Sequence, residues 1–230
     1  MSLRKSLNYL LLAATFIASL LNAAETAKPS PWADWLEPDF PFFSSIVDAR
    51  NAGENPLSNN LTPRGLILNL GNNCWACFDT DLLRVSAIWR GNAVTPEALA
   101  QKSYHPAGGK TKGGQVVLPK PSGNVWIANG IYPGWQIGER LELGDPRKAA
   151  PSAEEIGRGP LDEEQGRFNA LYLSGQGTVL EYTIGNTRIR ETISASEHGE
   201  QFIVERHFEI DQSDRPLLLV LGLKANGGVT

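Results

Sequence analysis

The sequence has little of what metal, haem and redox sites require. It holds two cysteines and three histidines in 230 residues, and His105, His198 and His207 are scattered singly along the chain. A structural zinc ion needs four protein ligands, so no metal site is expected. Haem attachment needs a histidine directly after a Cys-x-x-Cys pair, and Phe78 follows Cys77 here. We therefore expect no cofactor in this chain.

A basic cluster is also missing. The 21 lysines and arginines are outnumbered by 25 acidic residues, for a formal net charge of −4. Nucleic-acid binding requires a basic surface, so no nucleic-acid partner is expected. No Ser–His–Asp order, nucleophile elbow or phosphate-binding loop is visible either, so no catalytic residue is predicted. The glutamates of the C-terminal third could supply an acid–base pair, but solvated glutamates are the simpler interpretation.

Long hydrophobic runs are absent except near the N-terminus. Arg4 and Lys5 precede an apolar run over residues 7–21, and two alanines close it before the first acidic residue. This order is typical of a secretory signal peptide. The run is shorter than the ~20 residues of a spanning helix, so an uncleaved anchor has less support. The sequence predicts a signal peptide over 1–24 and a periplasmic or secreted product without a stable membrane anchor.

The rest of the chain divides into a lead segment and a domain. Residues 25–63 are rich in proline and aromatic residues, which predicts an extended arm that lies against the domain. Residues 64–230 are predicted to form an all-β antiparallel β-sandwich with long irregular loops. Loops are expected over 106–114 and 144–166, and a helical turn over 97–102.

The C-terminal third carries the clearest strand pattern. Alternating runs separated by glycine- and asparagine-containing turns indicate an antiparallel meander with one face more exposed to solvent. The five runs are Phe168–Ser174, Thr178–Ile184, Arg188–Ser194, Phe202–Ile210 and Pro216–Leu223. The last run is strongly apolar and is followed by only a short tail. It either closes the sheet as a central strand or indicates a domain that is incomplete at its C-terminus, and we favour the second.

Cys74 and Cys77 form the most conspicuous motif, Cys-Trp-Ala-Cys. In a strand, residues three apart lie ~10 Å apart and point to opposite faces. A disulfide needs Cα atoms within ~7 Å, so a bridge requires a turn over residues 72–77. A structural disulfide and two unbridged thiols both stay open. A redox pair has the least support, because a strand-like stretch and not a helix follows the motif.

Two further groups are candidates for ligand binding. On a strand, Asp79 and Asp81 would share a face, as a metal or a sugar hydroxyl requires, with Arg84 nearby. We favour the alternative, an Asx turn that leads into a strand over 82–89 with Arg84 paired to a carboxylate.

The second group, Trp126, Tyr132 and Trp135, lies in an aromatic and glycine-rich stretch. Flat rings of this kind could stack on the apolar faces of a sugar. The alternative, in which Trp126 and Trp135 fill the core of the sandwich, is favoured.

The segment Phe-Asp-Thr-Asp-Leu-Leu-Arg at 78–84, followed by Trp89-Arg90-Gly91, resembles an uncharacterised domain family of exported planctomycete and verrucomicrobial proteins. Residues 32–43 and 64–68 fit the same family. Its domain commonly precedes sorbosone-dehydrogenase-like propellers and c-type cytochrome domains. The resemblance implies association with periplasmic sugar oxidation and assigns no catalytic residue. Any haem c would belong to a missing C-terminal part or to a partner.

The meander over 168–223 resembles part of the galactose-mutarotase-like sandwich. Together these patterns predict a non-catalytic accessory or carbohydrate-recognition module of a sugar-oxidising system. One alternative is a mutarotase-like enzyme domain that uses Glu205 or His207. The other is a structural domain that docks a haem or propeller partner.

Overall fold

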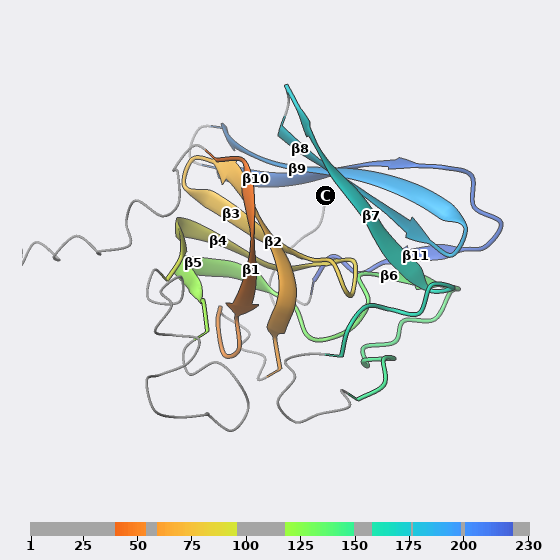
Figure 1. Ribbon diagram of the computed structural model, residues 1–230. Coiled ribbons are helices and arrows are strands. Elements are labelled where there is room, and N and C mark those ends of the chain that lie inside the picture. The colour runs from red at the N-terminus through yellow and green to blue at the C-terminus, as the bar shows by residue number, and fades with distance from the viewer. Residues whose placement is uncertain are drawn as a thin grey trace, which may run out of the picture. The chain divides into compact units, whose positions relative to one another are not determined.

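The structure is a computed structural model that describes residues 40–53, 59–95, 118–149, 158–175, 177–198 and 201–222 (Figure 1). The regular elements of these residues are all β-strands, in antiparallel sheets, so the predicted all-β class is confirmed. Within the same ranges no helix is long and apolar enough to cross a bilayer. The predicted signal peptide, the helical turn over 97–102 and the loop over 106–114 lie outside the described residues.

Sheet 1 is a five-stranded meander whose spatial order follows the chain. Its strands are β1 (Phe42–Asp48), β2 (Leu61–Gly71), β3 (Cys74–Asp79), β4 (Arg84–Val94) and β5 (Pro121–Ala128). Between β2 and β3 the backbone turns through Gly71, Asn72 and Asn73, with φ of 78°, 51° and 57°. Glycine and asparagine adopt this left-handed conformation most readily, so the chain reverses directly before Cys74.

Part of the segment expected as an extended arm belongs to this sheet. β1 pairs with β2 from Phe42 opposite Leu68 to Asp48 opposite Leu61. Phe42 and Phe43 are half-buried, whereas the ring of Phe40 is 46% exposed. The sheet therefore begins some twenty residues before position 64, because the apolar residues of β1 pair with a free edge of β2.

Sheet 2 is the predicted C-terminal meander. It contains β7 (Gly166–Ser174), β8 (Gly177–Ile184), β9 (Thr187–His198) and β10 (Gln201–Ile210), in the order β10-β9-β8-β7. The fifth predicted run is not part of it. Instead, β11 (Leu217–Leu219) pairs with β6 (Trp135–Ile137) in a two-stranded sheet. Leu217 and Leu219 pack there against the core between the sheets, which places this run beside β6.

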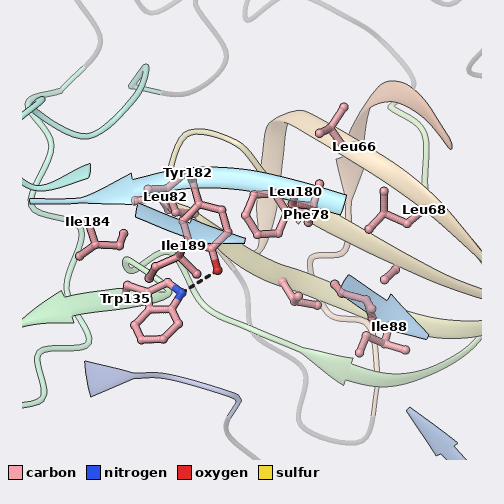
Figure 2. Close-up of a cluster of buried hydrophobic side chains, with 14 of the residues drawn as sticks. Leu66, Leu68, Phe78, Leu82, Ile88, Trp135, Leu180, Tyr182, Ile184 and Ile189 are labelled. Atoms are coloured by element: carbon pink, nitrogen blue, oxygen red, sulfur yellow. Dashed lines mark hydrogen bonds between the residues drawn. The ribbon is translucent and has the colours of Figure 1, made fainter. Parts of the chain in front are cut away.

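The two large sheets face each other across one apolar core (Figures 1 and 2). Leu68 and Phe78 contribute from sheet 1, and Leu180, Tyr182 and Ile189 from sheet 2. The rings of Phe78 and Tyr182 stack with centroids 5.6 Å apart. Each large apolar side chain buried in this way stabilises the fold by about 1.5–3 kcal/mol. The predicted antiparallel sandwich is thus confirmed.

Candidate functional site

Cys74 and Cys77, the candidate disulfide pair, are not bridged in the structure. Both residues lie in β3 as free, fully buried thiols. Cys74 faces the core between the sheets, whereas Cys77 belongs to a second apolar cluster on the opposite face of sheet 1. The reversal of the chain ends at Asn73, before the first cysteine, so the pair has strand geometry and cannot bridge.

The thiols also lack the environment of a reactive pair. Burial raises the pKa of Cys74 to about 11 and that of Cys77 to about 12. The nucleophilic form of cysteine is the thiolate, so both thiols are inert at neutral pH. Of the two alternatives that the sequence left open, a disulfide and two unbridged thiols, the structure supports the unbridged thiols.

Asp79 and Arg84 form a buried ion pair at the turn between β3 and β4. Asp79 Oδ1 accepts hydrogen bonds from the backbone N–H of Asp81 at 3.0 Å and of Leu82 at 3.3 Å, which is an Asx turn. Its Oδ2 accepts one from Arg84 Nε at 3.1 Å, and both side chains are 1% exposed. The predicted Asx turn and carboxylate pairing are confirmed, and the strand begins at Arg84, not at Leu82.

The rest of the Arg84 guanidinium is satisfied by protein groups. It donates to the carbonyl oxygens of Asn129, at 2.8 Å, and Gly130, and to Asn60 Oδ1 at 3.3 Å. A guanidinium with protein partners on both terminal nitrogens has little capacity left for a ligand. Arg84 therefore connects three parts of the chain by hydrogen bonds: the β3–β4 turn, the segment after β5 and the residue before β2.

Asp81 is held by two arginines. Its carboxylate lies 2.6 Å from Arg64 Nε and 3.8 Å from Arg147 Nη1, and it is 3% exposed. Burial and the neighbouring charge of Asp79 raise the pKa of Asp81. Arg147 pairs in turn with Asp145 at 2.9 Å. The described parts of the predicted loop over 144–166 contain no strand before position 166, and this ion network fixes them to the β3–β4 turn.

The aromatic candidates are packed against the protein. Tyr132 is 2% exposed and donates its hydroxyl to Asn129 Oδ1 at 3.1 Å. Trp135 is 6% exposed, so its ring face cannot carry a sugar. Trp126 is half-buried, with its ring edge-on to Phe202 at a centroid distance of 4.9 Å. Two of the three rings, Tyr132 and Trp135, are therefore buried and do not form an exposed platform; the alternative, core packing of Trp126 and Trp135, holds for Trp135, whereas Trp126 is only half-buried.

A hydrogen-bonded network crosses the inner face of sheet 2. Trp135 Nε1 donates to the Tyr182 hydroxyl at 2.9 Å, and that hydroxyl donates to Glu191 Oε2 at 2.7 Å. Figure 2 shows the Trp135–Tyr182 contact inside the core. Arg206 Nε donates to Glu191 Oε1 at 2.6 Å. Burial and the Glu191 charge raise the pKa of Tyr182, which keeps its proton on the phenol. The network links β6, β8, β9 and β10.

The outer face of sheet 2 carries the candidate site. Outward side chains of its four strands surround a hollow of about 470 Å³. They include Tyr172, Val179, Arg190, Thr192, His207 and Glu209. The Tyr172 ring is 47% exposed, and His207 and Glu209 are exposed as well. An exposed aromatic ring bordered by hydrogen-bonding side chains can hold a ligand that has both an apolar face and hydroxyl groups.

Arg190 is already oriented within this hollow. Its Nε donates to Glu181 Oε2 at 2.9 Å, and this hydrogen bond raises the pKa of Arg190. The pair lies across neighbouring strands β8 and β9, with Glu209 opposite Arg190 on β10. Charged groups therefore border one side of the hollow, while Val179 and Thr192 form its floor.

Sequence reasoning missed Tyr172, Arg190 and Thr192. The strand alternation contained a usable signal, since alternate residues of the meander must face solvent. Which outward residues become neighbours depends on strand register, and the β-bulge between Phe168 and Ala170 shifts that register. His207 and the glutamates of the C-terminal third were noticed in sequence, but no pattern joined them to Tyr172.

No group of three or more His, Cys, Asp or Glu side chains that could hold a metal ion occurs in the part of the chain that the structure describes. In comparisons with known proteins, the profile of one family, described as "Domain of unknown function (DUF6797)", matches residues 76–191. This span includes the motif at 78–84. It begins within β3, ends within β9 and covers β4 to β8 entirely. No curated protein and no solved structure matches the chain. The likeness to galactose-mutarotase-like domains stays a prediction.

Proposed function

We propose that this chain, which belongs to the DUF6797 family of domains of unknown function, is a non-catalytic carbohydrate-recognition module. The observation that carries the proposal is the hollow on the outer face of sheet 2, with the half-exposed ring of Tyr172 at its border. An exposed ring on a mostly polar sheet face offers an apolar surface to a ligand that water also solvates well. Sugars have this combination of apolar ring faces and hydroxyl edges.

The neighbours of Tyr172 suit hydroxyl groups. The Thr192 hydroxyl can donate or accept a hydrogen bond, Glu209 accepts, and Arg190 donates from a guanidinium whose direction is fixed by Glu181. The buried Tyr182–Glu191 contact holds the strands beneath the hollow. Because the site is held in place before a ligand arrives, little ordering free energy is lost on binding.

The wider setting of the proposal comes from the sequence. The pattern over residues 1–24 places the module in the periplasm or outside the cell. The resemblance of the 78–84 motif supports the further proposal that the module works with a sorbosone-dehydrogenase-like or c-type cytochrome domain, in which case any haem c belongs to that partner. In this role the module brings a sugar-oxidising system to its polymeric or oligomeric substrate.

An enzymatic role for the outer face has less support. Glu205 and Glu209 are four residues apart on one strand, which separates them by about 13 Å. The carboxylate pairs of glycosidases are typically about 5–9.5 Å apart. Glu181 and Glu209 lie on strands either side of β9, and Arg190 stands between them. By strand spacing this pair is about 9.6 Å apart, at the upper end of the glycosidase range. Glu181 is however already bound to Arg190 at 2.9 Å, and it is this pairing that favours binding over hydrolysis.

Calorimetric titration of the purified chain with a panel of soluble plant, algal and bacterial glycans tests the proposal. We expect saturable binding of at least one glycan and a loss of about 2–10-fold in affinity in Tyr172→Ala, from the removed aromatic contact. Phe40→Ala is the matched control, because Phe40 is 46% exposed but lies outside sheet 2. Binding that Tyr172→Ala leaves unchanged, or no binding at all, would contradict the proposal.

A further inference from the structure

Resting on the proposed function, we infer that the hollow takes the interior of a linear oligosaccharide of at least three sugar units, laid across the strands of sheet 2. The strand register aligns the lining residues across the sheet, and β7 and β10 form its two edges.

Four hollow-lining residues stand in one row across the sheet. Tyr172 of β7 is opposite Val179 of β8, Val179 is opposite Thr192 of β9, and Thr192 is opposite His207 of β10. Neighbouring strands are about 4.8 Å apart, so the row spans about 14 Å. An extended chain of pyranose rings advances by about one strand spacing per ring. The row therefore matches three successive sugar units.

These four side chains line the hollow as one strip across the sheet, called the trough below. Val179 and Thr192 are short and half-buried, whereas Tyr172 and His207 are exposed at the two ends. The adjacent row contains Glu181, Arg190 and Glu209, and its Arg190–Glu181 ion pair borders the trough along one side. A ligand that follows the trough contacts Tyr172 first and His207 last.

Tyr172 on β7 and His207 on β10 mark the two ends of the trough, and a sugar unit can lie on each exposed ring while the chain continues past it. β7 and β10 are the two outer strands of sheet 2, so the row runs from one edge of the sheet to the other (Figure 1). A site for the end of a sugar chain would need a wall to stop it. A trough that runs from edge to edge admits a chain that continues past both edges, which is how an interior stretch binds.

The test is a calorimetric series of β-1,4-linked gluco-, xylo- and manno-oligosaccharides from one to six units. We expect the affinity to rise up to three or four units and then to level off. Tyr172→Ala and His207→Ala should each lower hexasaccharide affinity severalfold. With disaccharides, which cannot reach both ends, His207→Ala should have at most a twofold effect.

A blocking substitution provides an independent readout. Val179→Trp places a bulky ring on the trough floor and should lower the affinity for the hexasaccharide at least tenfold. Thr183→Trp is the matched control, because Thr183 faces outward on the same strand but does not line the hollow. Circular dichroism and thermal unfolding establish that both variants are folded before they are titrated.

The outcomes separate the two proposals. Monosaccharides that bind as tightly as hexasaccharides would overturn the interior-chain inference and leave carbohydrate recognition standing. Tight hexasaccharide binding that survives Val179→Trp would overturn it too. If neither these oligosaccharides nor the wider glycan panel bind, the proposed function fails and the inference fails with it.

Discussion

The two sheets share an antiparallel meander topology but differ in their outer faces. In sheet 1, alternate residues point to two apolar clusters, so Cys74 and Phe78 are buried on one side and Cys77 and Trp89 on the other. In sheet 2 only the inner residues are buried, and the outer face carries Tyr172 and charged side chains. Sheet 1 therefore has interior environments on both sides, whereas sheet 2 leaves one face to solvent.

The comparison separates a structural region from a candidate binding region within one family domain. The Phe-Asp-Thr-Asp-Leu-Leu-Arg motif lies at the β3–β4 turn, where Asp79, Asp81 and Arg84 are bonded to protein groups. The hollow lies on the outer face of sheet 2, where the same kinds of side chain are exposed. A polar motif that is distinctive in sequence is thus not by itself a ligand site.

The largest effect is expected where a charge is buried in sheet 1. Arg84→Met leaves Asp79 buried without its cation and should lower the free energy of unfolding by about 3–5 kcal/mol. Arg64→Met is the control, because Arg64 is 55% exposed and Arg147 remains near Asp81. Arg64→Met should lower the free energy of unfolding by at most about 1 kcal/mol. Urea unfolding measures both, and equal effects would contradict a structural role specific to Arg84.

The cysteines test whether both faces of β3 are buried. The reference pKa of a thiol is 9.0, and burial raises it to about 11 for Cys74 and about 12 for Cys77. Stability from these thiols is fully present below pH 9 and falls above it, because the unfolded chain then loses protons that the folded chain keeps. Across pH 8–11, Cys74→Ala/Cys77→Ala should flatten the fall, by about 1–3 kcal/mol at pH 10. An unchanged pH profile would argue against burial of the thiols.

A smaller effect is expected on the inner face of sheet 2. Glu191→Gln weakens the contacts with Tyr182 and Arg206 and should lower the free energy of unfolding by about 2 kcal/mol. Glu205→Gln on the solvent face of β10 should change it by less than about 0.5 kcal/mol. Chemical unfolding of the two variants side by side checks the contrast. Equal losses of stability in the two variants would contradict the burial of the inner face of sheet 2.

The smallest effect is expected where the sheets meet at the surface. Arg90 of β4 pairs with Glu197 of β9 at 2.7 Å and lies over the Phe202 ring at 4.8 Å. Both charged side chains are roughly half-exposed, so Arg90→Ala should lower the free energy of unfolding by about 0.2–1 kcal/mol. Thermal unfolding at low and high salt should show the ion-pair part of this difference shrinking with salt. A salt-independent loss would assign the effect to the ring contact.

The sequence predicted elements better than it predicted neighbours. Strand alternation correctly located β7 to β10, and the Asx turn at Asp79 followed from residue type and spacing. The partner of β11 could not be read from sequence, because its apolar residues suit any edge above the core. The row from Tyr172 to His207 was equally hidden, since it depends on register across four strands.

The most direct test of the account is a backbone-amide NMR titration of the chain with the best-binding oligosaccharide from the calorimetric series. The account predicts shift changes confined to the outer face of sheet 2, largest near Tyr172, Thr192 and His207, with residues 79–84 and 126–135 unchanged. Shift changes concentrated at residues 126–135 or 79–84 instead would contradict it and would return the binding site to the aromatic stretch or to the family motif.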